Sequence, residues 1–199
     1  HPRRCYHVRV SIRTRGFTGE PEVRVAAGRH ALSFERPIRI DSTADWTTHD
    51  IVFNSLDRDR VSVTFGTWRP IRGTIEWRDW AIEEAGPVNV LRRAGAPLAV
   101  RGLTEGADFD SIVDPRLGVA PWAGQYEGWH APPPIRVRRP DGTRLRVSWT
   151  HAALVYGQAT ACVSEPRVIE LFADEVRRVR ELFGPTPLMM MHDEIRAMG

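Results

Sequence analysis

The chain of 199 residues is 42% hydrophobic and carries 28 basic and 25 acidic residues, which give a net charge of +3. Such a chain can bury a core as one large or two small domains, and it holds no apolar run near the ~18 residues of a membrane-spanning helix. All the basic residues are arginine, interspersed with apolar or acidic residues rather than gathered in a stripe. This distribution argues against a nucleic-acid partner.

The first half of the chain predicts a β domain over residues 1–85. Residues 6–14 alternate strictly, with Tyr6, Val8, Val10 and Ile12 on one face, as in a strand with one buried face. Turn residues separate six further predicted strands, at 22–26, 31–34, 38–40, 46–53, 60–65 and 74–82. Short strands at this spacing, with no helix between them, predict an antiparallel β-sandwich or jelly roll.

A second domain is expected over residues 86–199, after the linker at 83–87. Short extended pieces at 88–93 and 97–100 are followed by an irregular stretch at 105–134, rich in Gly, Pro and Asp. Asp141-Gly142 then predicts a hairpin, with a strand at 143–150 that ends at His151.

The C-terminal part changes to helical spacing. Apolar residues recur every three or four positions over 165–183, which predicts an amphipathic helix that Gly184 and Pro185 end. Residues 188–191 are continuously apolar, as in a strand buried on both faces. A helix that leads into such a strand is half of an α/β unit, so we expect the chain to be a fragment of a longer protein.

The two cysteines match no metal-binding or redox spacing. Cys5 and Cys162 lie far apart in the chain, so two buried thiols are expected, with a disulfide between them as the alternative.

Residues 5–85 carry a resemblance to a known class. Their relevant segments are Asp45-Trp46, 51–54 (IVFN), 61–66 (VSVTFG) and 73–80 (GTIEWRDW). These segments resemble the second half of a carbohydrate-binding β-sandwich module. The resemblance implies that exposed aromatic rings stack on sugars, and that a structural calcium is possible near the edge of the sandwich, where Asp79 stands.

Seven tryptophans are candidates for such stacking. Trp46, Trp77 and Trp80 fall within predicted strands, so a core role is expected for them first. Trp68 lies in a loop with polar flanks and is the preferred sugar platform, followed by Trp122 and Trp129 in a loop rich in Gly and Pro.

Residues 86–199 carry a second resemblance. The motifs are 89–98 (NVLRRAGAPL), 108–109 (DF), 114–115 (DP), 141–148 (DGTRLRVS), His151, 156–158 (YGQ), Cys162, Ser164, Pro166 and 192–196 (HDEIR). Their order is similar to that in large bacterial glycoside-hydrolase-like proteins, with a sandwich ahead of a (β/α)8 barrel. The resemblance implies the truncated start of a TIM-type barrel, the remainder of that barrel as a partner, and an extracellular or periplasmic location.

The acidic cluster after the apolar strand is the candidate catalytic site. Active sites of α/β folds lie at the carboxyl ends of strands, where Asp193 and Glu194 stand. Neighbours in an extended chain point to opposite faces, so one of them would act with a carboxylate on a later strand. His151, Tyr156, His192, Arg196 and Trp68 are the candidate substrate-binding residues.

These observations lead to a functional hypothesis with two alternatives. We expect a fragment of a glycoside hydrolase that acts on poly- or oligosaccharide and is inactive alone, without a metal site or a cofactor other than the possible calcium. The alternatives are a non-catalytic carbohydrate-binding module and a structural sandwich. The acidic cluster would then cap a helix and form ion pairs, whereas exposed coplanar tryptophans would favour the binding module.

Overall fold

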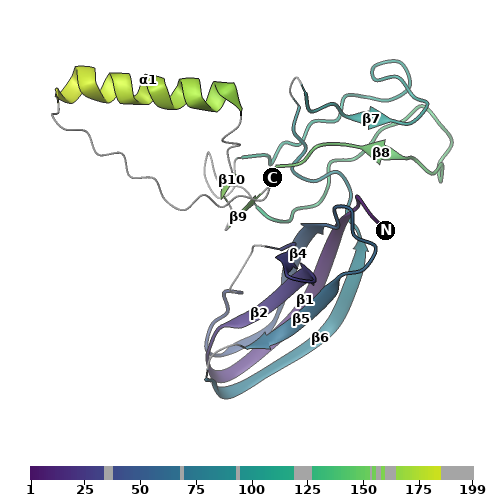
Figure 1. Ribbon diagram of the computed structural model, residues 1–199. Coiled ribbons are helices and arrows are strands. Elements are labelled where there is room, and N and C mark those ends of the chain that lie inside the picture. The colour runs from purple at the N-terminus through teal and green to yellow at the C-terminus, as the bar shows by residue number, and fades with distance from the viewer. Residues whose placement is uncertain are drawn as a thin grey trace. The chain divides into compact units, whose positions relative to one another are not determined.

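In the computed structural model, the described residues are mainly β and include one helix in the C-terminal part of the chain (Figure 1). The structure describes residues 1–33, 38–67, 70–92, 95–118, 127–152, 154–155, 158–159 and 165–184. The chain divides into two compact units, His1–Ala159 and Thr160–Gly199. Among the described residues, no helix is long and apolar enough to cross a membrane.

Two three-stranded antiparallel sheets form the first part of the first unit. One sheet has the order β4-β1-β6 and the other β3-β2-β5. Their strands are β1 (Cys5–Thr18), β2 (Pro21–Ala27), β3 (His30–Ala31), β4 (Ala44–Asn54), β5 (Ser62–Thr67) and β6 (Arg72–Glu84). The prediction of a mainly β fold is therefore confirmed, whereas a jelly-roll topology stays a prediction.

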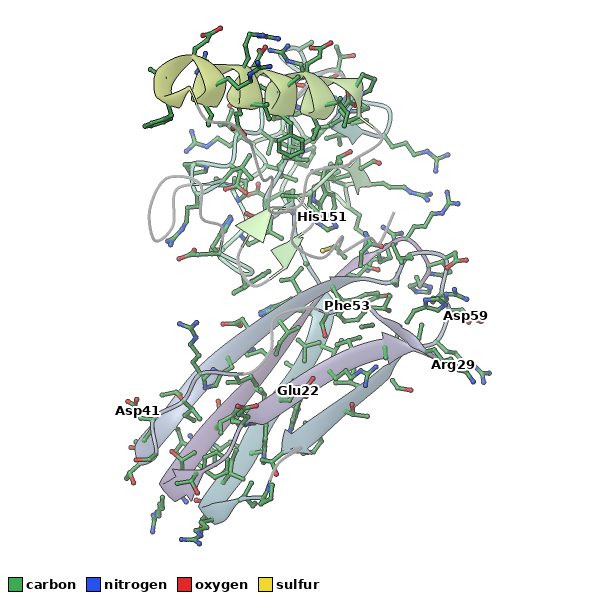
Figure 2. The ribbon with its side chains drawn as sticks, turned by 60° about the vertical axis from the view of Figure 1, so that its left-hand side comes forward. Glu22, Arg29, Asp41, Phe53, Asp59 and His151 are labelled. Carbon is green, nitrogen blue, oxygen red and sulfur yellow. The ribbon has the colours of Figure 1, made fainter. Side chains whose placement is uncertain are left out.

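The two sheets share one hydrophobic core, as in a β-sandwich. Alternate residues of the inner strands point inward, because successive side chains of a strand point to opposite faces. Each strand therefore contributes residues two apart. The buried members are Val8, Val10, Ile12, Val23, Val25, Ala27, Leu32, Ile51 and Phe53. Phe53 lies between the sheets near the end where His151 is found, and Asp41 lies at the other end (Figure 2).

Two strand predictions were wrong in this sandwich. Residues 38–40 form no strand, although Ile38 donates a backbone hydrogen bond to Pro21 (2.9 Å) and packs on the core. The strand predicted at 31–34 ends at Ala31, since the backbone N–H of Val25 bonds the hydroxyl of Ser33 (3.0 Å) instead of a strand carbonyl. Leu32, Ile38 and Ile40 lie on irregular backbone and still pack on the core. Their apolar spacing in the sequence looks the same as that of a strand.

The described residues in the remainder of the first unit form little regular structure. Strands β7 (Ala99–Val100) and β8 (Val147–Ser148) pair antiparallel, and β9 (Leu154–Val155) pairs with β10 (Gln158–Ala159). The hairpin predicted at Asp141-Gly142 is wrong, because the partner of β8 is β7 and not the segment before the turn. That segment contains prolines at 132–134 and 140, which offer no N–H to a sheet.

The helix of the second unit was predicted closely. Helix α1 spans Pro166–Phe183, with the Glu165 side chain accepting a hydrogen bond from the backbone N–H of Arg167. Gly184 ends the helix in the left-handed conformation (φ 52°) and donates its N–H to the carbonyl of Arg180 (2.9 Å). The strand predicted at 188–191 lies outside the described residues, so the barrel start stays a prediction.

Candidate functional site

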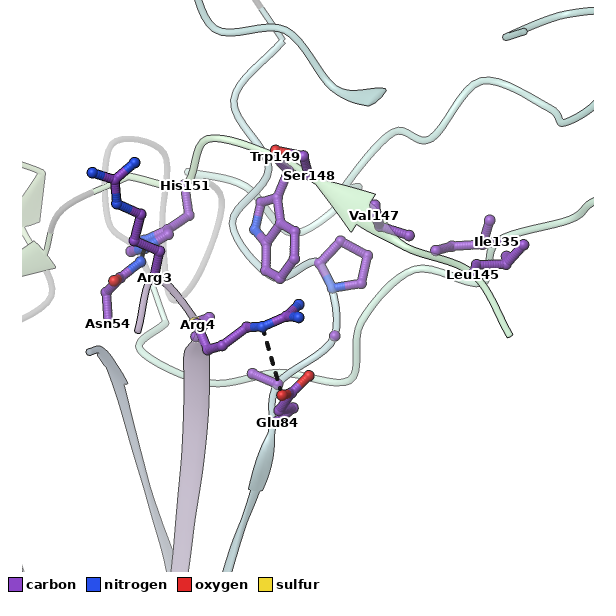
Figure 3. A pocket seen from close by; sticks show the side chains of 14 residues that line it. Arg3, Arg4, Asn54, Glu84, Ile135, Leu145, Val147, Ser148, Trp149 and His151 are labelled. Atoms are coloured by element: carbon purple, nitrogen blue, oxygen red, sulfur yellow. Dashed lines mark hydrogen bonds and ion pairs between the residues drawn. The ribbon is translucent and has the colours of Figure 1, made fainter. Parts of the chain in front are cut away.

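A pocket of about 320 Å³ lies at the end of the β4-β1-β6 sheet (Figure 3). Its walls come from the start of β1, the ends of β4 and β6, and the segment that contains β8. The lining residues are Arg3, Arg4, Cys5, Asn54, Glu84, Ala85, Gly86, Pro87, Ile135, Leu145, Val147, Ser148, Trp149 and His151. The pocket therefore joins the sandwich to the irregular segment that follows it within the first unit.

Backbone hydrogen bonds hold the walls of the pocket together. Ala85 donates to the carbonyl of Cys5 (2.8 Å) and Ser55 donates to the carbonyl of Arg4 (2.9 Å). The backbone N–H of Arg3 bonds the carbonyl of Leu56, and both residues have a positive φ, 54° and 52°. Residues other than glycine rarely adopt this backbone conformation, and residues with such strain are found more often at functional sites.

His151, which was predicted to bind substrate beside the acidic cluster of Asp193 and Glu194, lines this pocket. Its Nδ1 lies 3.1 Å from the carbonyl oxygen of Ala152, and its Nε2 lies 3.5 Å from Nδ2 of Asn54. A carbonyl oxygen only accepts, so Nδ1 carries a proton and Nε2 faces the amide donor. Its substrate-binding role stays a prediction.

The charged groups of the pocket are two arginines and one carboxylate. Nε of Arg4 lies 3.7 Å from Oε1 of Glu84, and both side chains are partly exposed. Arg3 forms no ion pair with any described residue. Burial raises the pKa of the Cys5 thiol to about 12, so this thiol contributes no charge near neutral pH.

A second feature is the aromatic cluster, which consists of Phe65, Trp77 and Trp80. Trp77 and Trp80 are three residues apart in β6, which in a regular strand would place them on opposite faces. The register with β1 shifts between them: Ser11 pairs with Arg78 and Arg9 with Ala81. Asp79 adopts a positive φ (55°) within this bulge. The extra residue brings both tryptophans to one face.

The rings of the aromatic cluster pack together and are partly open to solvent. Trp77 and Trp80 lie 5.9 Å apart between ring centroids with planes 15° from parallel, and Phe65 lies 4.5 Å from Trp80. Phe65 is 53% exposed and Trp80 is 36% exposed, whereas Trp77 is half-buried against the core. In the described residues, β5 pairs only with β2 and β6 only with β1, so the aromatic cluster belongs to the edge strands of the two sheets.

The structure also shows a group of contacts around one buried histidine, which the sequence had not singled out. This histidine cluster consists of His7, Asp50, Glu83 and Trp129. His7 is only 2% exposed, with Nε2 2.6 Å from Oδ1 of Asp50 and Nδ1 3.3 Å from Oε1 of Glu83. The ring of Trp129 stacks on its face at 3.6 Å between centroids. Both ring nitrogens face carboxylates, so His7 donates to both only when doubly protonated. No periodicity could have indicated it, since His7 occupies an outward-facing position of β1.

The other tryptophan predicted for the core lies on the outer face of its sheet. Trp46 is half-buried, with the guanidinium carbons of Arg78 and Arg13 at 3.9 and 4.8 Å from its ring centroid. Arg13 also forms a bidentate ion pair with Glu76 (2.7 and 2.8 Å), which lowers the pKa of that carboxyl. Trp46 therefore belongs to a polar surface network.

Trp68, Tyr156, His192, Asp193, Glu194 and Arg196 lie outside the described residues. Asp79, the residue considered for calcium, pairs with Arg78 at 2.9 Å. The described part of the chain brings together no group of three or more His, Cys, Asp or Glu side chains able to hold a metal ion.

Comparisons with models of known families, with curated proteins and with solved structures found no match to this chain.

Proposed function

We propose that this protein binds carbohydrate non-covalently through the aromatic cluster of Phe65, Trp77 and Trp80. One observation carries the proposal: the two tryptophans are nearly parallel, and the outer one, together with Phe65, remains open to solvent. The two tryptophans are stacked on each other rather than coplanar, so the surface offered to a sugar is that of Trp80 and Phe65, supported by Trp77.

The physical reason is that the apolar C–H face of a sugar ring matches the flat face of an indole. Aromatic side chains combine a large apolar area with few rotatable bonds, so they lose little conformational entropy on binding. The bulge at Asp79 fixes Trp80 against Trp77, and Phe65 approaches from the neighbouring edge strand. The cluster is therefore organised before a ligand arrives, which favours affinity.

A purely structural role would account for Trp77, but less well for its neighbours. Trp77 packs against the core of the sandwich, where a tryptophan is commonly found. Phe65 and Trp80 add exposed apolar surface beside it, and contiguous exposed patches mark binding surfaces more often than scattered residues do. Trp77 thus supports the two rings that would contact a sugar.

The test is binding of the 199-residue chain to a panel of soluble polysaccharides, measured by affinity gel electrophoresis and calorimetry. Trp80→Ala and Phe65→Ala should each weaken binding, for Trp80 by about 30-fold, which corresponds to the roughly 2 kcal/mol of an aromatic hot spot. Trp46→Ala is the matched control, because it removes a half-buried tryptophan from the outer face of the same sheet. Equal binding by Trp80→Ala and the parent would reject the proposal.

Hydrolysis remains a separate prediction for the acidic cluster of Asp193 and Glu194. In a longer parent protein, Glu194→Gln and Asp193→Asn should differ, with the residue that faces the substrate losing most of its turnover of aryl glycosides. Loss of a catalytic carboxylate should lower the rate by about three orders of magnitude, or roughly 4 kcal/mol. Near-parental rates in both variants would show that the cluster is structural.

A further inference from the structure

We infer that the pocket at the end of the β4-β1-β6 sheet binds a carboxylate-bearing ligand of about the size of one sugar acid. The pocket is separate from the aromatic cluster, and it differs from that cluster in charge and shape. The saccharide nature of the ligand rests on the function proposed above, whereas its negative charge follows from the pocket alone.

The first argument is the charge of the lining. The lining holds two arginines, Arg3 and Arg4, and one carboxylate, Glu84, which lies 3.7 Å from Arg4 in a loose ion pair. One carboxylate balances only one of the two guanidinium charges, so the lining keeps a net positive charge. Figure 3 shows Arg4 and Glu84 below the ring of Trp149, with Arg3, Asn54 and His151 to one side.

The second argument is an unsatisfied donor. The indole Nε1 of Trp149 is buried and has no hydrogen-bond partner among the described residues. A buried polar group without a partner destabilises a fold, and such groups are few in native proteins. Indole only donates, so an acceptor such as a carboxylate oxygen would satisfy it, once a shift of the ring opens the enclosed N–H to the pocket.

The third argument is that neighbouring groups are already oriented. Oδ1 of Asn54 accepts a hydrogen bond from the backbone N–H of Leu56 (2.7 Å), which leaves its Nδ2 donors toward His151. The side chain of Arg3 lies at the same side of the pocket as Asn54 and His151 (Figure 3). Arg3, Trp149 and Asn54 therefore present donors, and a carboxylate supplies only acceptors.

The fourth argument is the shape of the remaining wall. Ile135, Leu145 and Val147 form an apolar end of the pocket, away from Arg3 (Figure 3). An inorganic anion would contact only the polar end of the pocket. A sugar acid would also place the apolar face of its ring against the apolar end. The volume of about 320 Å³ lies at the lower limit of small-molecule sites, about 300–1,000 Å³, which suits a single ring.

The test is calorimetric titration of the 199-residue chain with sodium galacturonate, galactose, sodium acetate and inorganic phosphate at constant ionic strength. Saturable binding of galacturonate, at least tenfold tighter than each of the other three, is expected. Arg3→Gln should weaken it about tenfold, equivalent to about 1.4 kcal/mol, and Trp149→Phe should weaken it severalfold. Arg29→Gln, at an exposed turn, changes the net charge equally and should leave affinity unchanged.

Several results would overturn the inference. Galactose binding as tightly as galacturonate would remove the role of the charge, and acetate or phosphate binding as tightly would remove the role of the ring. Unchanged affinity in both Arg3→Gln and Trp149→Phe would place binding elsewhere. Trp80→Ala should leave galacturonate binding intact, so failure of the polysaccharide proposal and failure of this pocket can be told apart.

Discussion

Replacing His7 by alanine tests whether the histidine cluster fastens the irregular segment of the first unit to the sandwich. The 2.6 Å contact with Asp50 is a charge-assisted hydrogen bond, and such bonds contribute about 1.5–3 kcal/mol. The stack on Trp129 adds roughly 0.5–1.5 kcal/mol. Glu83 is 58% exposed, so solvent screening reduces its 3.3 Å contact to at most about 1 kcal/mol.

We therefore expect His7→Ala to lower the free energy of unfolding by about 3 kcal/mol, or the Tm by roughly 6–12 °C at 2–4 °C per kcal/mol. Urea unfolding followed by tryptophan fluorescence measures the change, and Trp129 should become more solvent-exposed in the native variant. His30→Ala is the control, because His30 is exposed in β3 and should lose no more than about 0.5 kcal/mol.

A double-mutant cycle with Asp50→Ala isolates the pair. The coupling between His7 and Asp50 should exceed about 1 kcal/mol, since residues in direct contact are not additive. A loss below about 1 kcal/mol in His7→Ala, or a coupling near zero, would refute the role assigned to the cluster.

Three further predictions concern stability and reactivity. Gly73→Ala should destabilise the fold by more than about 3 kcal/mol, because φ is 79° and the new Cβ would collide with the carbonyl oxygen of Gly16. Gly142→Ala is the control: its φ is 82°, but no atom lies within 4 Å of the new Cβ, so the protein should lose only about 1–2 kcal/mol. Equal losses in urea unfolding would contradict that distinction. Burial lowers the pKa of His49 below 6.5, so the unfolded state binds a proton at His49 more readily than the folded state does. The free energy of unfolding should therefore decrease as pH falls from 6.5 through the lowered pKa. His49→Gln should remove this part of the pH dependence, and parallel pH profiles of the two proteins would disprove the assignment. In a Cys162→Ser background, Cys5, whose pKa burial raises to about 12, should resist thiol reagents at pH 8 until the protein unfolds, and rapid native labelling would show otherwise.

Local patterns were sufficient for β1 and for the helix. Strict alternation over residues 6–14 predicted β1 and its core residues, because the side-chain period of a strand is set by its own backbone. The helix was predicted for a similar reason, from its apolar spacing and from Gly184 and Pro185 at its end. Both kinds of element carry their signal within a few neighbouring residues.

The candidate sites depend on contacts between distant residues. A regular strand would place Trp77 and Trp80 on opposite faces, and only the bulge formed on pairing with β1 places them together. His7 stood at an outward position, and Trp129, more than a hundred residues later, buries it.

The sequence by itself therefore determined the mainly β class, the alternating core of the sandwich and the bounds of the helix. Only the tertiary structure decided the bulged register of β6, the burial of His7 and the pocket where Arg3, Glu84 and Trp149 meet. The physical reason is that periodicity records which face of its own element a residue occupies. What lies opposite that face is set by chain segments far away in sequence, through packing and hydrogen bonds that no local pattern encodes.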